Sequence, residues 1–264
     1  MEQLSIDNQK GQSKETSIVI RSIRHGESSR IVTLFSKSRG KFAVIAKGAR
    51  KSKSGAALGS ISPPSQIEAI VYFKPSRSIQ VLSQVSLING YSAIKKDLSL
   101  MAYSTAMLQI IERTMTDAEP NQQVYDTLSR SLNEMEANSL DPKVILWVFE
   151  LYLLKKIGFW LNPFPCPICG NRLAVIGENN HLLLDEGSIC CTNCEPSNLN
   201  RFRMSGESVS ILRQISSGKR ELLKNIKSTD RARREITNGI EKFLKHHHQS
   251  IGELTALKLL DKLE

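Results

Sequence analysis

The chain has 264 residues and a formal net charge of +10, with 40% hydrophobic and 23% charged residues. These fractions are those of an ordinary globular protein and exclude wholesale disorder or a fibrous protein. The longest apolar stretches, 144–149 and 151–154, are far shorter than the roughly 20 residues that span a bilayer, so we expect no membrane segment. Because the N-terminus has neither the basic start nor the apolar core of a secretory signal, we expect a protein of the reducing cytoplasm.

The positive charge is concentrated in two parts of the chain. Residues 1–90 carry a net charge of +9, residues 91–198 carry −5 and residues 199–249 carry +7. Between positions 17 and 60, ten cations are opposed by a single acid, Glu27. Such a surface repels itself unless a polyanion neutralises it, and a phosphate backbone does so with release of counterions. A solvated, soluble face is the simpler alternative, but the density of cations favours nucleic acid as the ligand.

The first 90 residues have the pattern of a small β domain. Residues 1–15 are polar and unpatterned, which predicts a mobile tail. Five short strands in about 75 residues predict a β-barrel of the OB type at 16–88, with a small sandwich as the alternative. The predicted strands lie within 18–21, 31–35, 41–46, 66–73 and 78–85, and a flexible basic loop covers 47–60.

Beyond residue 89 the hydrophobic period becomes helical. Asp141-Pro142 predicts a helix start, and Gly158 predicts the end of the same helix. Residues 89–264 are therefore expected to form an all-α domain, interrupted by a cysteine-rich insertion at about 162–200. The other helices are expected at about 93–115, around Val124, Leu128 and Leu132, and at about 207–217, 229–249 and 251–263.

All five cysteines lie within 29 residues, and four of them form two CxxC pairs with 21 residues between. This spacing is close to that of a four-thiolate zinc site, in which the closed coordination sphere indicates a structural rather than a catalytic metal. A disulfide framework does not fit a cytoplasmic chain, and two paired motifs argue against a thioredoxin-like redox centre. Cys190 competes with its neighbour as the third ligand, and we favour the regular spacing. The predicted ligands are Cys166, Cys169, Cys191 and Cys194.

No catalytic constellation is recognisable in the sequence. It contains no phosphate-binding loop ending in Gly-Lys-Ser/Thr, no Gly-x-Ser-x-Gly and no His-x-Glu of the zinc deaminases. We therefore expect a binding protein and not an enzyme.

The order of three segments resembles the RecO family of DNA repair proteins. The first is Arg24-His25-Gly26-Glu27-Ser28-Ser29-Arg30-Ile31-Val32-Thr33-Leu34-Phe35, and the second is Ala46-Lys47-Gly48-Ala49-Arg50-Lys51-Ser52-Lys53-Ser54. The third runs from Phe149-Glu150-Leu151-Tyr152 through Gly158-Phe159 into Cys166-Pro167-Ile168-Cys169-Gly170. The resemblance extends over roughly residues 15–260.

The resemblance implies an α+β multidomain protein, with an N-terminal OB-fold β-barrel followed by an all-α domain that holds a four-cysteine zinc-binding insertion. It further implies a nucleoid-associated recombination mediator that binds single- and double-stranded DNA and anneals complementary strands. The implied partners are RecR and the C-terminal tail of the single-stranded DNA-binding protein, with RecA loaded indirectly at gaps.

The basic N-terminal block is the expected DNA platform. Phe35, Phe42, Tyr72 or Phe73 could stack bases, although barrel core is the more usual place for such side chains. A zinc-containing RNA- or ribosome-binding protein is the alternative function, since the same charge and barrel would serve it. The cations expected at phosphates are Arg21, Arg24, Lys37, Arg39, Lys41, Lys47, Arg50, Lys51 and Lys53.

Overall fold

The computed structural model describes residues 11–48, 60–171, 180–194, 200–248, 251–252 and 254–260. The chain forms two compact units, one of residues 1–137 with 254–264 and the other of residues 138–253. The helices between the barrel and residue 137 belong to the same unit as the barrel. The two units therefore divide at residue 137, whereas the predicted domain boundary is at residue 88. Within the described residues, no helix is both long and apolar enough to cross a membrane.

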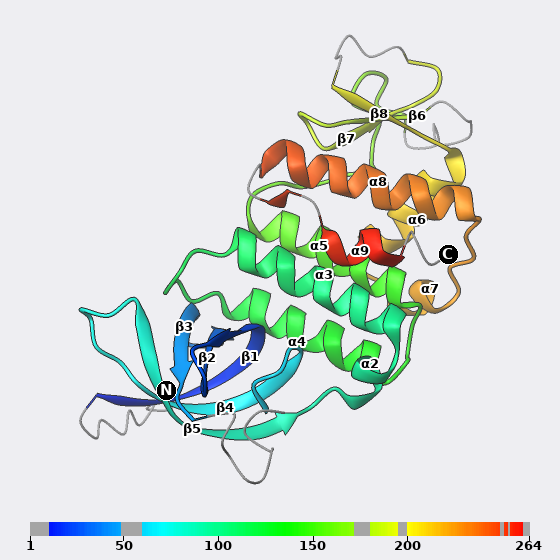
Figure 1. Ribbon diagram of the computed structural model, residues 1–264. Coiled ribbons are helices and arrows are strands. Elements are labelled where there is room, and N and C mark those ends of the chain that lie inside the picture. Colours follow the sequence, from blue (N-terminus) through cyan, green and yellow to red (C-terminus); the bar gives the residue numbers. More distant parts are fainter. Residues whose placement is uncertain are drawn as a thin grey trace, which may run out of the picture. The chain divides into compact units, whose positions relative to one another are not determined.

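The first unit contains a closed five-stranded barrel, drawn in blue to cyan in Figure 1. The strand order is β1-β2-β3-β5-β4, and β3 pairs with β5 in parallel while the other pairs are antiparallel. This arrangement confirms the predicted OB-type barrel and excludes the sandwich. The strands are β1 (Gln12–His25), β2 (Ser29–Ser36), β3 (Gly40–Ala46), β4 (Ser65–Tyr72) and β5 (Ile79–Asn89).

Strand β1 closes the barrel because it is long enough to pair with two neighbours. Its first half pairs with β4 from Gln12 to Val19, and its second half pairs with β2 from Ser17 to His25. The alternating apolar residues of these strands point inward and fill the barrel. The buried cluster consists of Val19, Val32, Leu34, Phe42, Val44, Ala46, Ile61, Ile67, Ala69 and Val71.

Residues 12–15 of the expected N-terminal tail belong to β1, which begins at Gln12, and residues 1–10 lie outside the described residues. The Glu15 carboxylate is buried and accepts hydrogen bonds from Ser36 at 2.7 Å, from Arg39 at 2.7 Å and from Ser38. Burial opposes ionisation of Glu15, but these hydrogen bonds outweigh it and lower the pKa of the carboxyl. The Glu15 side chain, one of those that suggested a tail, therefore holds β1 to the end of β2 and the turn between β2 and β3.

The region expected as one helix at 93–115 is two helices, α2 (Ser92–Lys96) and α3 (Leu98–Thr114). Asp97 between them has an extended backbone, and its carboxylate accepts a hydrogen bond from the N–H of Leu100 at 2.9 Å. An aspartate in this position caps the second helix and so separates it from the first. The unit is completed by α4 (Gln122–Glu136) and by α9 (Thr255–Leu260), which packs against α3.

The second unit combines four helices with a small sheet. The helices are α5 (Pro142–Lys156), α6 (Gly206–Ser216), α7 (Arg220–Lys224) and α8 (Asp230–His247). The sheet has the order β7-β6-β8 and is formed by β6 (Asn180–Leu183), β7 (Ser188–Cys190) and β8 (Arg201–Met204). Strands β6 and β7 lie in the expected cysteine-rich insertion at about 162–200 and β8 follows it directly, and the sequence analysis assigned no strand to this region.

Helix α5 begins where the sequence predicts. Asp141 is its N-cap and accepts a hydrogen bond from the N–H of Lys143 at 2.8 Å, and Pro142 occupies the first turn. The same carboxylate forms an ion pair with Arg233 at 2.7 Å. Burial by itself would raise the pKa of Asp141, but the contacts with Arg233 and the backbone outweigh it, so the pKa is lowered. Arg233, which belongs to the second basic block, thus ties α8 to the start of α5.

Gly40 allows the barrel to contact a helix connection of the same unit. It has a φ of +69°, and a Cβ added there would overlap the backbone of Glu119. Gly48 has a similar φ of +67°, but a Cβ there would meet nothing within 4 Å. We expect Gly48→Ala to cost about 1–2 kcal/mol of unfolding free energy through its backbone, and Gly40→Ala about 1–3 kcal/mol more through overpacking. Urea unfolding of the two variants measures the difference, and equal costs would contradict the close contact.

Glu150 on α5 is 4% exposed, and burial together with the nearby Glu241 raises its pKa to about 8. Because the ordinary value is 4.5, the folded state retains this proton over a range in which the unfolded chain loses it. We therefore expect stability to fall as pH rises from about 4.5 to about 8 and to level off above that. Glu150→Gln should remove this slope from a pH series of urea unfolding, and an unchanged slope would refute the assignment.

Candidate metal centre and nucleic-acid interface

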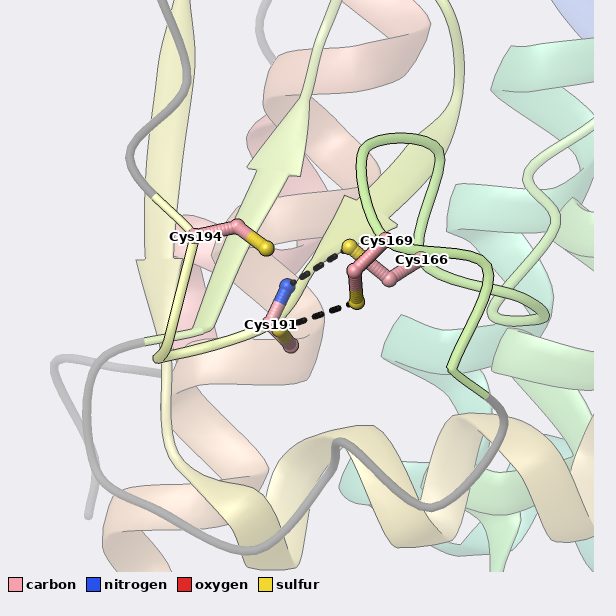
Figure 2. Close-up of side chains that lie close together, drawn as sticks. All are labelled: Cys166, Cys169, Cys191 and Cys194. Carbon is pink, nitrogen blue, oxygen red and sulfur yellow. Dashed lines mark hydrogen bonds between the residues drawn. The ribbon is translucent and has the colours of Figure 1, made fainter.

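Two tight turns of the insertion carry the paired cysteines. In the first turn, the N–H of Gly170 donates to the carbonyl of Cys166 at 2.9 Å, and Gly170 has a φ of +69°, which favours glycine. In the second turn, the N–H of Cys194 donates to the carbonyl of Cys191 at 3.1 Å. Strand β7 ends at Cys190, one residue before this turn. The CxxC spacing and the sheet together therefore bring the two turns face to face (Figure 2).

The sulfur atoms of Cys166, Cys169, Cys191 and Cys194 all lie within 4.8 Å of one another (Figure 2). The sulfurs of Cys169 and Cys191 are 3.8 Å apart. In a tetrahedral site with Zn–S bonds of about 2.3 Å, neighbouring sulfurs are separated by about 3.8 Å. The four residues brought together are those that the spacing singled out, and their arrangement could hold a metal ion.

The electrostatics of the cluster also fit a cation. Burial of the Cys166 thiol favours its neutral form, but backbone N–H groups at its sulfur outweigh this and lower its pKa to about 6. Hydrogen bonding to Cys191 raises the pKa of the Cys194 thiol, and burial raises that of Cys191. One thiolate is therefore favoured, while hydrogen bonding and burial hold the thiols of Cys194 and Cys191 in their neutral form. A divalent cation bound among the sulfurs would stabilise them as thiolates.

Cys190 is not part of the sulfur group. Its side chain is fully buried, and its thiol donates to the carbonyl of Cys194 at 3.3 Å and, more weakly, to that of Cys191 at 3.6 Å. Burial raises the pKa of Cys190 to about 12, but the pKa values of Cys191 and Cys194 are raised as well, so the position of the Cys190 sulfur and not its acidity distinguishes it. The geometry thus separates the two adjacent cysteines that spacing alone left open.

The base of the insertion is attached to the end of α8. His246 Nε2 lies 2.6 Å from a carboxylate oxygen of Asp185, and His247 Nε2 lies 2.8 Å from the carbonyl oxygen of Leu184. Burial lowers the pKa of His247. The histidine run is thus the last turn of a helix, and it supports the hairpin that leads to Cys190 and Cys191.

Four of the nine expected phosphate-binding cations form ion pairs within the first unit. Their partners are carboxylates that are distant in sequence, on β1, α3, α4 and the connection after α3. The pairs are Arg21 with Glu112 (2.8 Å), Lys37 with Asp126 (3.2 Å), Arg39 with Glu15 (2.7 Å) and Lys41 with Asp117 (3.2 Å). Glu27 is therefore not the only acid opposing the basic block, and part of its charge is neutralised by the fold itself.

Lys41 has a structural role in this arrangement. Its side chain is 14% exposed, and its ammonium donates to the carbonyl of Glu112 at 2.6 Å. Its own carbonyl accepts a hydrogen bond from the N–H of Ala118 at 2.7 Å. A phosphate could reach this ammonium only by displacing these contacts.

Arg24 and Lys47 are exposed and have no ion-pair partner among the described residues. Arg24 lies directly across from Arg30 in the β1–β2 pair, and Arg30 lies across from Ala46 in the β2–β3 pair. These cations therefore gather where β1, β2 and β3 meet at one end of the barrel. The remaining three expected cations, Arg50, Lys51 and Lys53, follow Lys47 in the chain and lie outside the described residues.

Two further cations, absent from the sequence-based selection, lie in the loop between β4 and β5. Lys74 and Arg77 are exposed, and the loop is held by the Gln80 amide, which bonds the N–H of Lys74 at 2.8 Å and the carbonyl of Arg77 at 2.6 Å. In OB-folds the loops after strands 1 and 4 border the oligonucleotide-binding face. The position of this loop between the last two predicted strands was the signal that could have identified them.

Most of the aromatic side chains considered for base stacking are not available. Phe35 and Phe42 are buried, and the Phe73 ring is covered by the Arg39 guanidinium at 4.3 Å. Tyr72 is 39% exposed and is the most accessible of the four. The described barrel surface therefore offers charge more than stacking.

Comparison with known proteins covers almost the whole chain. Residues 11–91 match the family model "Recombination protein O N terminal", and residues 95–252 match "Recombination protein O C terminal". The chain is 34% identical over 178 residues to the DNA repair protein RecO of Exiguobacterium sibiricum, which covers 67% of this chain and 68% of that protein. It is 28% identical over 230 residues to RecO of Desulfitobacterium hafniense strain Y51, covering 86% of this chain and 81% of the relative.

A third relative extends the similarity to nearly full length. The DNA repair protein RecO of Anaeromyxobacter sp. strain K is 27% identical over 252 residues, which is 95% of this chain and 96% of that protein. Together the two family models span the barrel, the helices from α3 to α8 and the four-cysteine cluster. On these grounds the chain belongs to the Recombination protein O family.

Proposed function

We propose that the protein is a non-enzymatic recombination mediator in DNA repair, which binds single- and double-stranded DNA and anneals complementary strands. The observation that carries this proposal is the group of unpaired cations at one end of a closed OB barrel, as far as the described residues extend. Family membership supports the recombination-repair role. On the same basis, its proposed partners are RecR and the C-terminal tail of the single-stranded DNA-binding protein. Together with them it would help to load RecA at gaps.

The proposed phosphate contacts fall into two groups. Arg24 and Lys47 need give up no ion pair of the described structure in order to bind phosphate, and Arg50, Lys51 and Lys53, which lie outside the described residues, are proposed from the sequence alone. Arg21, Lys37, Arg39 and Lys41 must first leave a carboxylate, so their contribution is smaller. Neutralising two strands on one basic surface lowers their mutual repulsion, and complementary sequences then pair more readily.

We further propose that the four clustered cysteines hold one structural zinc ion. Four thiolates complete a tetrahedral coordination sphere, so the metal would stabilise the insertion without an open position for catalysis. The ligands would be Cys166, Cys169, Cys191 and Cys194, in agreement with the spacing of their sulfurs.

The DNA platform can be tested with two double variants of equal charge change. Arg24→Ala/Lys47→Ala should weaken binding of a single-stranded oligonucleotide and reduce the slope of log K against log salt by about 1.4, because about 0.7 is lost per phosphate contact. Arg21→Ala/Lys37→Ala is the matched control and should change the slope less, since both cations are already paired. Fluorescence anisotropy over a salt series measures both slopes. A larger effect in the control, or tighter binding to RNA than to DNA of equal length, would contradict the proposal.

The metal proposal predicts about one zinc per chain by elemental analysis. Cys191→Ser should abolish zinc retention, because the hydroxyl is a poor replacement for a thiolate. Cys190→Ser is the matched control and should retain zinc, since its hydroxyl can still donate to the carbonyl of Cys194. The reverse pattern would assign the ligand to Cys190, and zinc retention by both variants would exclude this cluster.

A further inference from the structure

A short strip of aromatic and basic side chains lies at the C-terminal end of α5 in the second unit. Tyr152, Lys155 and Lys156 share one side of the helix, because residues three and four positions apart are neighbours on its surface. The Lys156 ammonium lies 5.3 Å from the centroid of the Tyr152 ring, and the Lys155 ammonium lies 4.8 Å from that of Trp160. Cation–π pairs occur about once per 70–80 residues, so two on adjacent lysines mark a local concentration.

The indole of Trp160 is held in solvent by its two neighbours in the chain. It is 57% exposed, whereas the other tryptophan of the protein, Trp147, is fully buried. Phe159 stacks on the His247 ring at 4.4 Å, and Leu161 is 3% exposed. Because both neighbours are anchored, Trp160 is directed outward on a fixed backbone.

The hairpin between β6 and β7 fixes this segment further. The N–H of Asn162 donates to the carbonyl of Gly187 at 2.6 Å, and a Cβ on Gly187 would lie 2.5 Å from the carbonyl oxygen of Trp160. A large exposed indole on such a rigid segment has little conformational entropy to lose when a ligand stacks on it.

The two lysines of the strip are not neutralised by the fold. Both are exposed, and neither forms an ion pair within the described part of the chain. Two acids of the same helix and of the adjoining hairpin are otherwise engaged, since Glu150 is buried and Glu186 accepts a hydrogen bond from Ser188 at 3.1 Å. The strip therefore differs from the barrel surface, where four cations are paired and the aromatic rings are mostly covered.

We propose that this strip is a second nucleic-acid site, in which a base of single-stranded DNA stacks on Trp160 while Lys155 and Lys156 contact the adjacent phosphates. The inference rests on the proposed DNA-binding function and adds a stacking side chain that is more exposed than Tyr72 of the barrel. An exposed cation–π contact is weak, so the Lys155 ammonium can move from the indole to a phosphate when a base takes its place. An acidic peptide would satisfy the lysines but would leave the indole face without a flat partner.

The intrinsic fluorescence of the full-length protein tests the proposal directly. The difference in emission between the wild type and Trp160→Phe isolates the exposed indole, and the buried Trp147 is left unchanged. We expect an oligothymidylate to quench this component, and an abasic oligonucleotide of equal length and charge to quench it much less. Trp160→Ala should weaken binding of oligothymidylate about fivefold or more, and Trp160→Phe should retain most of the affinity.

Variants of the lysines separate charge from stacking. Lys155→Ala/Lys156→Ala should lower the salt slope for single-stranded DNA by about 1.4. An unquenched indole, or wild-type affinity in Trp160→Ala, would overturn the proposal, and so would quenching by an oligoglutamate peptide but not by DNA. If DNA binds and Arg24→Ala/Lys47→Ala weakens that binding, but DNA does not quench the fluorescence of Trp160, only the proposal of the second site fails. If the wild type binds no DNA at all, the proposed function fails as well.

Discussion

Ion pairing within the first unit decides where the positive charge of this protein is exposed. Four barrel cations, Arg21, Lys37, Arg39 and Lys41, are neutralised by carboxylates of β1, α3, α4 and the connection after α3. Three of these ion pairs also hold the helical segments to the barrel. What the described part of the barrel leaves for a polyanion is the end at Arg24 and Lys47 and the β4–β5 loop with Lys74 and Arg77. Contacts between distant parts of the chain thus decide which cations form ion pairs within the unit and which stay exposed.

In the cysteine cluster, groups that would carry the same negative charge as thiolates are brought together. The fold places four sulfurs within 4.8 Å of one another, and the pKa of the Cys166 thiol is lowered while the pKa values of Cys191 and Cys194 are raised. Such a group is stable as several thiolates only around a cation. The described strands of this region have three or four residues each, and Cys166, Cys190 and Cys191 form a buried cluster with Leu183 of β6.

Prediction from the sequence succeeded where a local signal is strong. The alternation of apolar residues and the turns predicted all five barrel strands, and Asp141-Pro142 predicted the start of α5. It failed where a local signal is weak or ambiguous. Strands β6 to β8 are too short to show a period, and Asp97 interrupts a helical pattern by capping, which periodicity does not register. Glu15 looked like part of a tail because its partners Ser36 and Arg39 lie far along the chain.

By itself, the sequence determined the five N-terminal strands, the helical second part and the two CxxC pairs, because hydrophobic period and ligand spacing are local properties of a chain, and closure of the strands into a barrel was decided by the tertiary structure. Only the tertiary structure decided which cations are paired, which of two adjacent cysteines faces the other pair, and that Trp160 stands in solvent while Trp147 is buried. Those outcomes depend on contacts between residues far apart in sequence. A count of charges or aromatic residues along the chain does not contain them.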